Sequence, residues 1–328
     1  MDEGKKNIYD VYTLHLVRWK EDLFATVQTH VMQSVLKMVE KQRSGETIEQ
    51  AQIKSIVDSF VSLGLDECDP TKSTLDVYRY YFEKPFLAST QEYYRTESKQ
   101  FVAENSVVEY MKKAEARCDE EQDRVGLYLH PDIMQPLMRT CHQVLIAEQS
   151  TLLRDEFQML LDNDRQGDMA RMYKLLSRIP EGLEPLRLRF ETHVRKAGLS
   201  AVTKVTAGGA QETVEPKVYV EALLEIHARY KHLVDDAFQG EAEFVRSLDN
   251  ACREFVNRNA VCQQGSSKSP ELLAKYTDSL LKKSTRSAEE ADLEDMLEQI
   301  VRAVLPHAPQ AEQMFSLSRL YLSRRAQC

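Results

Sequence analysis

Apolar residues recur at steps of three and four along most of this chain, a spacing that fits one face of an α-helix. Period-two alternation of β-branched residues, which is typical of strands, is almost absent. The three clearest stripes are Val107, Met111, Ala114, Cys118, Gln122, Val125 and Leu129; Val220, Leu223, His227, Tyr230, Val234 and Ala237; and Phe244, Leu248, Ala251 and Phe255. The pattern predicts an all-α fold of about twelve helices.

An internal repeat organises these helices. Residues 109–112 (EYMK) can be laid over residues 243–246 (EFVR) at an offset of 134, and the same shift places Cys118 on Cys252. We expect five helices in about 1–130 and five more in about 131–264. Repeats of this kind bury their apolar faces against their neighbours, so the sequence predicts an elongated, solenoid-like stack.

Composition excludes several classes of protein. The chain has 328 residues and is 42% apolar, which is too apolar for a disordered polymer. No stretch reaches the ~18 uninterrupted apolar residues of a membrane span, and no apolar segment follows the N-terminus as in a signal peptide. A formal net charge of −9 argues against nucleic-acid binding. We expect a soluble intracellular protein, cytoplasmic and nuclear.

The sequence offers little for a metal or for redox chemistry. The six cysteines, which contain no CxxC motif, are expected to be reduced and mainly buried. Cys141 and His142 form the closest Cys–His pair, but adjacent helical residues point about 100° apart. Because zinc needs three or four convergent ligands, we predict no metal there. His227, on an apolar stripe, is expected to be a hydrogen-bonded core histidine.

The other polar groups that stand out in the sequence are also expected to have structural roles. The acidic pairs at 120–121 and 289–290 lie in helices rich in charge, so we expect solvated helix faces rather than acid–base catalysts. Five tyrosines cluster around one long helix: Tyr78, Tyr80, Tyr81, Tyr93 and Tyr94. Core packing is the favoured interpretation, with a partner surface as the alternative. No catalytic, cofactor-binding or metal-binding residue is predicted.

Several runs of residues resemble the cullin family. The run 266–276 (SSKSPELLAKY) resembles the cullin signature where the helical arm meets the C-terminal region. The runs 249–257 (DNACREFVN), 109–117 (EYMKKAEAR) and 171–173 (RMY) are also cullin-like. The likeness covers about residues 3–300 and is nearest to the cullin-1 type that scaffolds SCF ubiquitin ligases.

The resemblance implies a domain arrangement. Residues 1–130 would be the second of the family's three repeats, and residues 131–264 would be the third. Residues 265–300 would begin the C-terminal helical region, and residues 301–328 do not match. The family's adaptor and F-box proteins dock on the first repeat and its RING subunit docks beyond residue 300, so both sockets are expected to lie outside this chain. A truncated or alternative gene product would explain such ends.

Two functions are compatible with this resemblance. The first is a non-catalytic scaffold, or a fragment of one, in a cullin–RING E3 ligase of ubiquitin-dependent protein degradation. The second is a regulatory or decoy module that engages a cullin-binding exchange factor, with a non-functional truncated cullin as a further possibility. No cofactor, nucleic acid or membrane partner is expected. An enzyme is disfavoured because no catalytic constellation was found.

The repeat predicts a measurable shape. A compact globule of this length has a radius of gyration of about 20 Å. Two end-to-end repeats should give a clearly larger value, on the order of 27 Å or more, because a solenoid grows along one axis. Small-angle X-ray scattering of the purified chain measures this directly. A value near 20 Å would contradict the solenoid.

Overall fold

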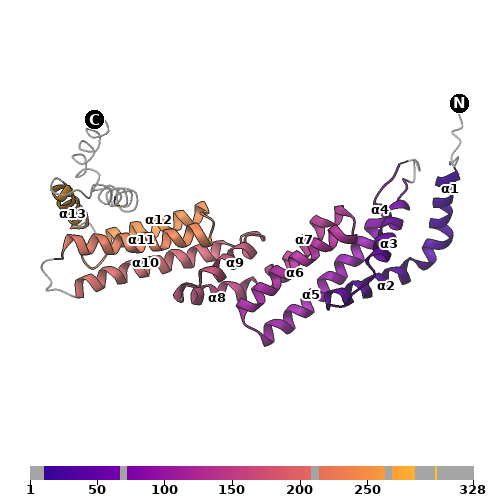
Figure 1. Cartoon of the computed structure of the whole chain (residues 1–328), viewed down its shortest axis with the longest axis horizontal. Coiled ribbons are helices and arrows are strands. Elements are labelled where there is room, and N and C mark those ends of the chain that lie inside the picture. The colour runs from indigo at the N-terminus through magenta and orange to yellow at the C-terminus, as the bar shows by residue number, and fades with distance from the viewer. Residues whose placement is uncertain (1–10, 67–71, 208–213, 263–267, 285–299, 301–328) are drawn as a thin grey trace, which may run out of the picture. The chain divides into compact units, whose positions relative to one another are not determined.

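The computed structural model describes all residues except 1–10, 67–71, 208–213, 263–267, 285–299 and 301–328 (Figure 1). The chain divides into two compact units: Met1–Leu153 with Arg178–Pro180, and Arg154–Ser177 with Glu181–Cys328. The predicted repeat boundaries at 130 and 264 stay a prediction. The predicted tail 301–328 lies outside the described residues, as do Glu289 and Glu290.

Helical segments build the first unit, and several of them join end to end. In chain order they are α1 (Val11–Arg18), η1 (Trp19–Phe24), α2 (Ala25–Arg43), α3 (Gln50–Ser62), α4 (Asp76–Tyr78), η2 (Arg79–Glu83), α5 (Lys84–Glu104), α6 (Val107–Tyr128), η3 (Pro131–Ile133), α7 (Met134–His142) and η4 (Gln143–Ala147). The segments η1, η2 and η4 are π-helical turns, and each continues an α-helix without a break.

The second unit is simpler. Its helices are α8 (Ser150–Asp162), whose first turn belongs to the first unit, α9 (Gln166–Leu176), α10 (Glu184–Ala207), α11 (Pro216–Ala237), α12 (Ala242–Asn257) and α13 (Lys268–Ser284). Over the described part of the chain the fold contains helices and no β-strand beyond one isolated bridge between Leu65 and Ser73. The all-α prediction is confirmed. None of these helices combines the length and apolar character of a membrane span.

The described helices divide unevenly at the predicted boundary. Continuous helical runs in the described residues number eleven, of which four lie before residue 130 and six lie between 131 and 264. The division into five and five helices stays a prediction, because residues 1–10 lie outside the described residues. In the second unit the helical path is interrupted between α8 and α9, where Asp164 adopts a positive φ of 54°. The equivalent stretch near residue 30 continues as one helix through α2.

The 134-residue offset is nevertheless visible in the helices. Helices α3, α5 and α6 begin at residues 50, 84 and 107, and α10, α11 and α12 begin at 184, 216 and 242. Each pair of starts differs by 134 to within two residues. Local signals agree with these starts, because the Ser106 hydroxyl caps α6 by accepting from the Glu109 amide at 3.3 Å and Pro216 opens α11.

The predicted stripes form the core. All four residues of the α12 stripe are at most 1% exposed, and Met111, Ala114 and Cys118 are equally buried on α6. Three members deviate: Val107 and His227 are only half-buried, and Gln122 is exposed. Cys118, Cys141, Cys252 and Cys262 are buried free thiols, as predicted, whereas Cys68 and Cys328 lie outside the described residues.

Close packing in the second unit depends on a glycine. A Cβ atom built on Gly198 of α10 would lie 2.3 Å from the ring of Phe255 on α12. Phe255 is 1% exposed, so its ring has little room to move away. Because Gly198 has no Cβ atom, the ring of Phe255 on α12 can pack directly against the backbone of α10.

We expect Gly198→Ala to destabilise the second unit, although alanine in a helix is normally favoured over glycine by about 1 kcal/mol. The overpacked methyl group should cost about 1–3 kcal/mol. Chemical denaturation of the full chain measures the difference.

The matched control is Gly126→Ala in α6, where a Cβ would meet nothing within 4 Å. This variant should gain up to about 1 kcal/mol from helix propensity alone. A Gly198→Ala protein as stable as the Gly126→Ala protein would show that the two helices do not pack as tightly as described.

Candidate functional site: a buried ion network in the first unit

A carboxylate with no exposure to solvent lies inside the first unit. Glu121, on α6, has a side chain that is 0% exposed. An isolated carboxylate in such a place would be strongly unfavourable, because burial removes the water that stabilises its charge. The surrounding residues must therefore supply charge and hydrogen bonds from the protein itself.

The first partner comes from α2. Arg43, the last residue of that helix, donates from Nε to Oε1 of Glu121 at 2.8 Å. Its Nη2 donates to the hydroxyl of Thr90 on α5 at 2.7 Å, and Thr90 in turn donates to the Phe86 carbonyl at 2.8 Å. Because Arg43 is only 3% exposed, one guanidinium connects α2, α5 and α6 inside the unit.

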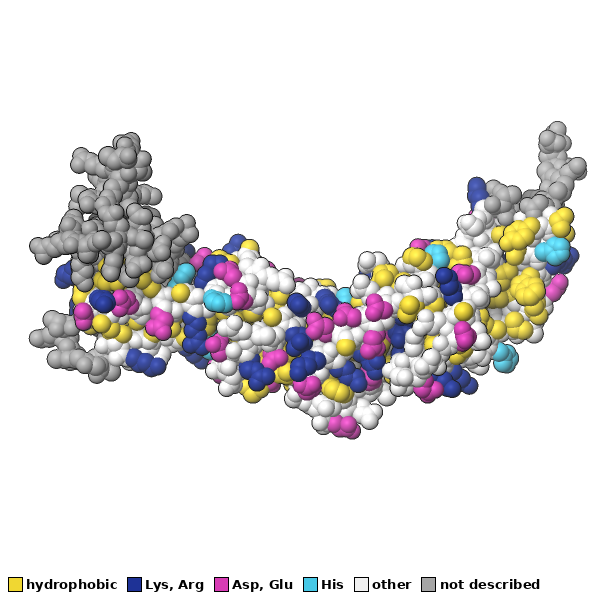
Figure 2. Space-filling view, viewed as in Figure 1, with side chains coloured by type: hydrophobic (Ala, Val, Ile, Leu, Met, Phe, Trp, Pro, Cys, Tyr) yellow, Lys and Arg dark blue, Asp and Glu magenta, His cyan; other side chains and the backbone are white. Residues whose placement is uncertain are grey.

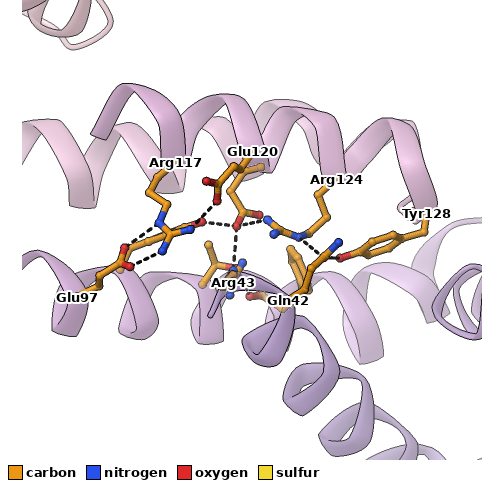
Figure 3. Close-up of polar contacts among 11 residues, drawn as sticks. Gln42, Arg43, Glu97, Arg117, Glu120, Arg124 and Tyr128 are labelled. Carbon is orange, nitrogen blue, oxygen red and sulfur yellow. Dashed lines mark hydrogen bonds and ion pairs between the residues drawn. The ribbon is translucent and has the colours of Figure 1, made fainter. Parts of the chain in front are cut away.

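The second partner lies one turn along α6. Arg124 forms an ion pair with Glu121 and donates from Nε to Oε1 of Gln42 at 3.0 Å. The same Gln42 oxygen accepts from the Tyr128 hydroxyl at 2.6 Å (Figure 3). Gln42 and Arg43 are adjacent, so the C-terminal turn of α2 is attached to α6 at two points.

Aromatic residues of α5 also contact the buried Glu121 and Arg43 side chains. The Tyr94 hydroxyl donates to Oε1 of Glu121 at 2.5 Å. The Arg43 guanidinium lies 5.1–5.6 Å from the ring centroids of Phe86, Tyr93 and Tyr94. Two arginines face one carboxylate, so the network carries a formal excess of one positive charge. The electron-rich ring faces offset part of that excess.

These contacts set the charge state of the buried groups. Burial alone would raise the pKa of Glu121, but the neighbouring guanidiniums of Arg43 and Arg124 outweigh it and hold that pKa below its usual value. Burial would likewise lower the pKa of Arg43, and the Glu121 carboxylate raises it instead. Both groups therefore stay ionised at neutral pH, and Glu121 cannot exchange protons with an outside substrate from its sealed position.

A second ion network adjoins the first on the surface of α5 and α6. Glu97 accepts two hydrogen bonds from Arg117, at 2.5 and 3.1 Å, and Arg117 also donates to Glu120 at 2.6 Å. Lys113 lies 3.2 Å from Glu97. Figure 3 shows both networks side by side along α6. The Glu120 side chain is 45% exposed, so solvent screens its contact with Arg117, whereas the Arg117 and Glu97 side chains are only 15% and 17% exposed.

The prediction for the acidic pair at 120–121 is thus half wrong. Glu120 lies on a solvated face as expected, whereas Glu121 is buried. The chosen stripe stepped by four from Cys118 to Gln122, but a step of three reaches Glu121 and then Val125 by a step of four. That register was readable from the sequence. What opposed it was the cost of a buried charge, which Arg124 and, 78 residues away, Arg43 together offset.

The other sequence candidates lie apart from this network. Cys141 is fully buried, and burial raises the pKa of its thiol. The neighbouring His142 is half-buried, and burial lowers its pKa. His227 is half-buried on α11 rather than inside the core. No group of three or more metal-ligating side chains occurs among the described residues.

The tyrosine cluster divides into two kinds. Tyr78 and Tyr94 are fully buried, which confirms core packing for these two. Tyr81 and Tyr93 are half-buried, and Tyr80 is 61% exposed. Of the five, only Tyr94 hydrogen-bonds to the carboxylate of the buried network. Sequence reasoning did not single out Arg43, Arg124 or Gln42, because nothing in their local pattern indicates that they meet.

Removing the buried carboxylate should destabilise the first unit strongly. Glu121→Ala leaves two buried guanidiniums facing each other without a counter-charge, a change that costs about 3–5 kcal/mol in comparable sites. Denaturation of the full chain by urea, followed by circular dichroism, measures the loss.

Two further variants define the comparison. Glu120→Ala, one residue away but solvated, should cost less than about 1 kcal/mol. The triple variant Arg43→Met, Glu121→Leu, Arg124→Met removes all three charges and should cost less than Glu121→Ala alone. Equal losses for Glu120→Ala and Glu121→Ala would contradict the buried network.

Comparison with known proteins gives the chain a family. The model of the cullin α-solenoid domain matches residues 1–304. Cullin-1 of Dictyostelium discoideum is 45% identical over 303 residues, which are 92% of this chain and 39% of that protein. Cullin-1 of Schizosaccharomyces pombe is 43% identical over 90% of this chain and 38% of its own length. Cullin-1 of Caenorhabditis elegans is 39% identical over 92% and 40%.

The chain therefore spans about two fifths of the length of these relatives. The family match extends over both compact units and agrees with the all-helical fold and the 134-residue repeat. On these grounds the chain belongs to the cullin family.

Proposed function

We propose that this chain acts as a non-catalytic scaffold segment of a cullin–RING E3 ubiquitin ligase of the SCF type, in ubiquitin-dependent protein degradation. The observation that carries the proposal is its 39–45% identity to three Cullin-1 proteins over about nine tenths of its length. The partners proposed with it are an adaptor with its F-box protein and a RING subunit, all inside the cell.

The physical task of such a segment is to hold two bound partners at a set separation. A set separation raises the effective concentration of one bound partner around the other, and the spacer itself performs no chemistry. A spacer performs this task only if its helices keep fixed relative positions under thermal motion. If the helices moved relative to one another, the distance between the two partners would vary, and the effective concentration would fall.

The first unit has features that suit this task. Arg43 and Glu121 tie the end of α2 to α5 and α6 through buried, charge-assisted hydrogen bonds. Such bonds are directional, so they favour one arrangement of the three helices over slipped alternatives. In the second unit the close approach at Gly198 restricts α10 and α12 in a similar way. Both features support a stiff body in each unit.

The test replaces the matching segment of Dictyostelium Cullin-1 with residues 1–304 of this chain. The chimera is reconstituted with adaptor, F-box protein and RING subunit, and ubiquitin transfer to a bound substrate is followed. We expect transfer to be retained. We also expect Glu121→Ala to reduce it and Glu120→Ala to leave it unchanged, because only the former disrupts the interior.

A chimera that assembles with all partners but does not support transfer would contradict the scaffold role. Separate pull-downs of the unmodified chain with adaptor, RING subunit and the cullin-binding exchange factor address the alternative. Capture of the exchange factor together with failure of the chimera would favour a regulatory or decoy module.

A further inference from the structure

A histidine lies where three helices of the second unit meet. His193 is on α10, and its two ring nitrogens face residues of two other helices. Nε2 lies 2.9 Å from the hydroxyl of Tyr230 on α11, and Nδ1 lies 3.3 Å from a carboxylate oxygen of Asp162 on α8. These three residues are called the His193 junction below. The junction is separate from the buried ion network, which belongs to the first unit.

The junction runs from the surface of the second unit into its interior. The Asp162 side chain is 57% exposed, whereas that of His193 is 16% exposed. Tyr230 is 4% exposed, and its ring centroid lies 5.6 Å from that of His193 at an angle of 80°. Phe190, one turn before His193 on α10, is fully buried. A change of charge at His193 therefore takes place beside the core.

Another histidine of the same unit provides a contrast. Figure 2 shows histidine side chains intermixed with acidic and basic ones on the surface of the second unit. The side chain of His232 on α11 is 66% exposed and lies 2.8 Å from Asp236, four residues along the same helix. Water screens an exposed pair of this kind. Because the pair lies within one helix, it does not tie α11 to a neighbour.

The distances favour one placement of the proton on neutral His193. With Nδ1 protonated, the ring donates to Asp162, and Nε2 accepts from the Tyr230 hydroxyl. The other tautomer would set the Nδ1 lone pair against the Asp162 carboxylate. The amide nitrogen of Gln158 lies 3.3 Å from Nδ1 but has a closer acceptor in Asp162, at 2.8 Å. Each polar atom of the neutral junction thus has a partner.

A second proton on the ring would disrupt this arrangement. In the imidazolium form both ring nitrogens are donors, so Nε2 can no longer accept from Tyr230. Among the described residues the Tyr230 hydroxyl has no other hydrogen-bond partner, and it is shielded from water. A buried hydroxyl hydrogen without an acceptor is unfavourable. Protonation of His193 therefore weakens the contact between α10 and α11 at this position.

The groups around the ring agree with this direction. Burial lowers the pKa of His193, Asp162 raises it, and the cations Arg229 and Lys196 lower it, with a net downward shift. The unfolded chain therefore binds a proton at this histidine more readily than the folded one does. Stability from the junction is fully present above about pH 6.5, the ordinary pKa of histidine, and falls as the pH drops below that value.

We infer that the His193 junction is a proton-sensitive contact, which holds α8, α10 and α11 together when His193 is neutral and loosens α11 from α10 when the ring is protonated. The first unit has no such contact at the equivalent positions. At the 134-residue offset these are Gln28, Ser59 and Thr96, none of which titrates. Acid sensitivity of this origin is therefore restricted to the second unit, and it does not depend on the ligase role proposed above.

Proton NMR of the full chain tests the titration of His193, whose signals are those that vanish in His193→Gln. We expect a midpoint below about pH 6.5. Asp162→Asn should lower that midpoint and Lys196→Gln should raise it, because the first removes an attractive charge and the second a repulsive one. Both side chains are exposed, so the fold should not change. A midpoint above about 6.5, or one that neither variant moves, would overturn the inference.

Hydrogen exchange, corrected for the intrinsic rate at each pH, tests the loosening. Between about pH 7.5 and about pH 5.5, amides of α11 around Tyr230 should lose protection at least about threefold. Amides of α5 and α6 should keep theirs, because ordinary carboxylates stay ionised in this range. His193→Gln should abolish the difference, and the matched control His232→Gln should retain it.

An equal loss of protection in the unchanged chain and in His193→Gln would overturn the inference, as would an equal loss in α5, α6 and α11. Asp162→Asn provides a test that keeps the histidine in place. Because this variant leaves the ring neutral to lower pH, the loss of protection around Tyr230 should move to lower pH with it. A loss that stays at the same pH would also contradict the proposal.

Discussion

The arrangement of the first unit depends on one buried carboxylate between two guanidiniums. Glu121 has no access to water, so its charge is stable only while Arg43 and Arg124 remain beside it. Arg43 can reach it only if α2 ends where it does and α5 presents Thr90 and Tyr94 toward the same point. Three helices distant in the sequence are thereby restricted to one mutual position.

The second unit carries different chemistry at the position equivalent to Glu121. At the 134-residue offset, Glu121 corresponds to Phe255 and Arg43 corresponds to Ser177. Where the first unit buries an ion pair, the second places an aromatic ring against Gly198. Apolar replacement of a buried ion network often preserves or increases stability. The charges of the first unit are thus better explained by the specificity of their geometry than by the free energy they contribute.

Local patterns were sufficient to predict much of this fold. The stripe at Phe244, Leu248 and Ala251 identified a buried face because it needs only helical periodicity. The Ser106 cap and the Pro216 start are local signals too, because each depends only on residues at one end of a helix. The network was missed because its decisive contact joins residues 78 apart. The turn at Asp164 between α8 and α9 has no counterpart within α2, so the repeat offset alone does not predict every helix end.

The π-helical turns affect how substitutions and gaps in this chain should be interpreted. Each of η1 and η2 accommodates an extra residue within a helix that continues on both sides, whereas η4 is followed by a turn at residues 148–149. Because the wider π-helical turn takes up that residue, deleting it would restore a regular α-helix and leave the downstream residues close to their present orientation. Deleting a residue from a regular α-helical stretch would instead rotate everything downstream by about 100°. A single-residue length difference between relatives is therefore tolerated at η1 and η2 but changes which face is buried elsewhere in the same helices.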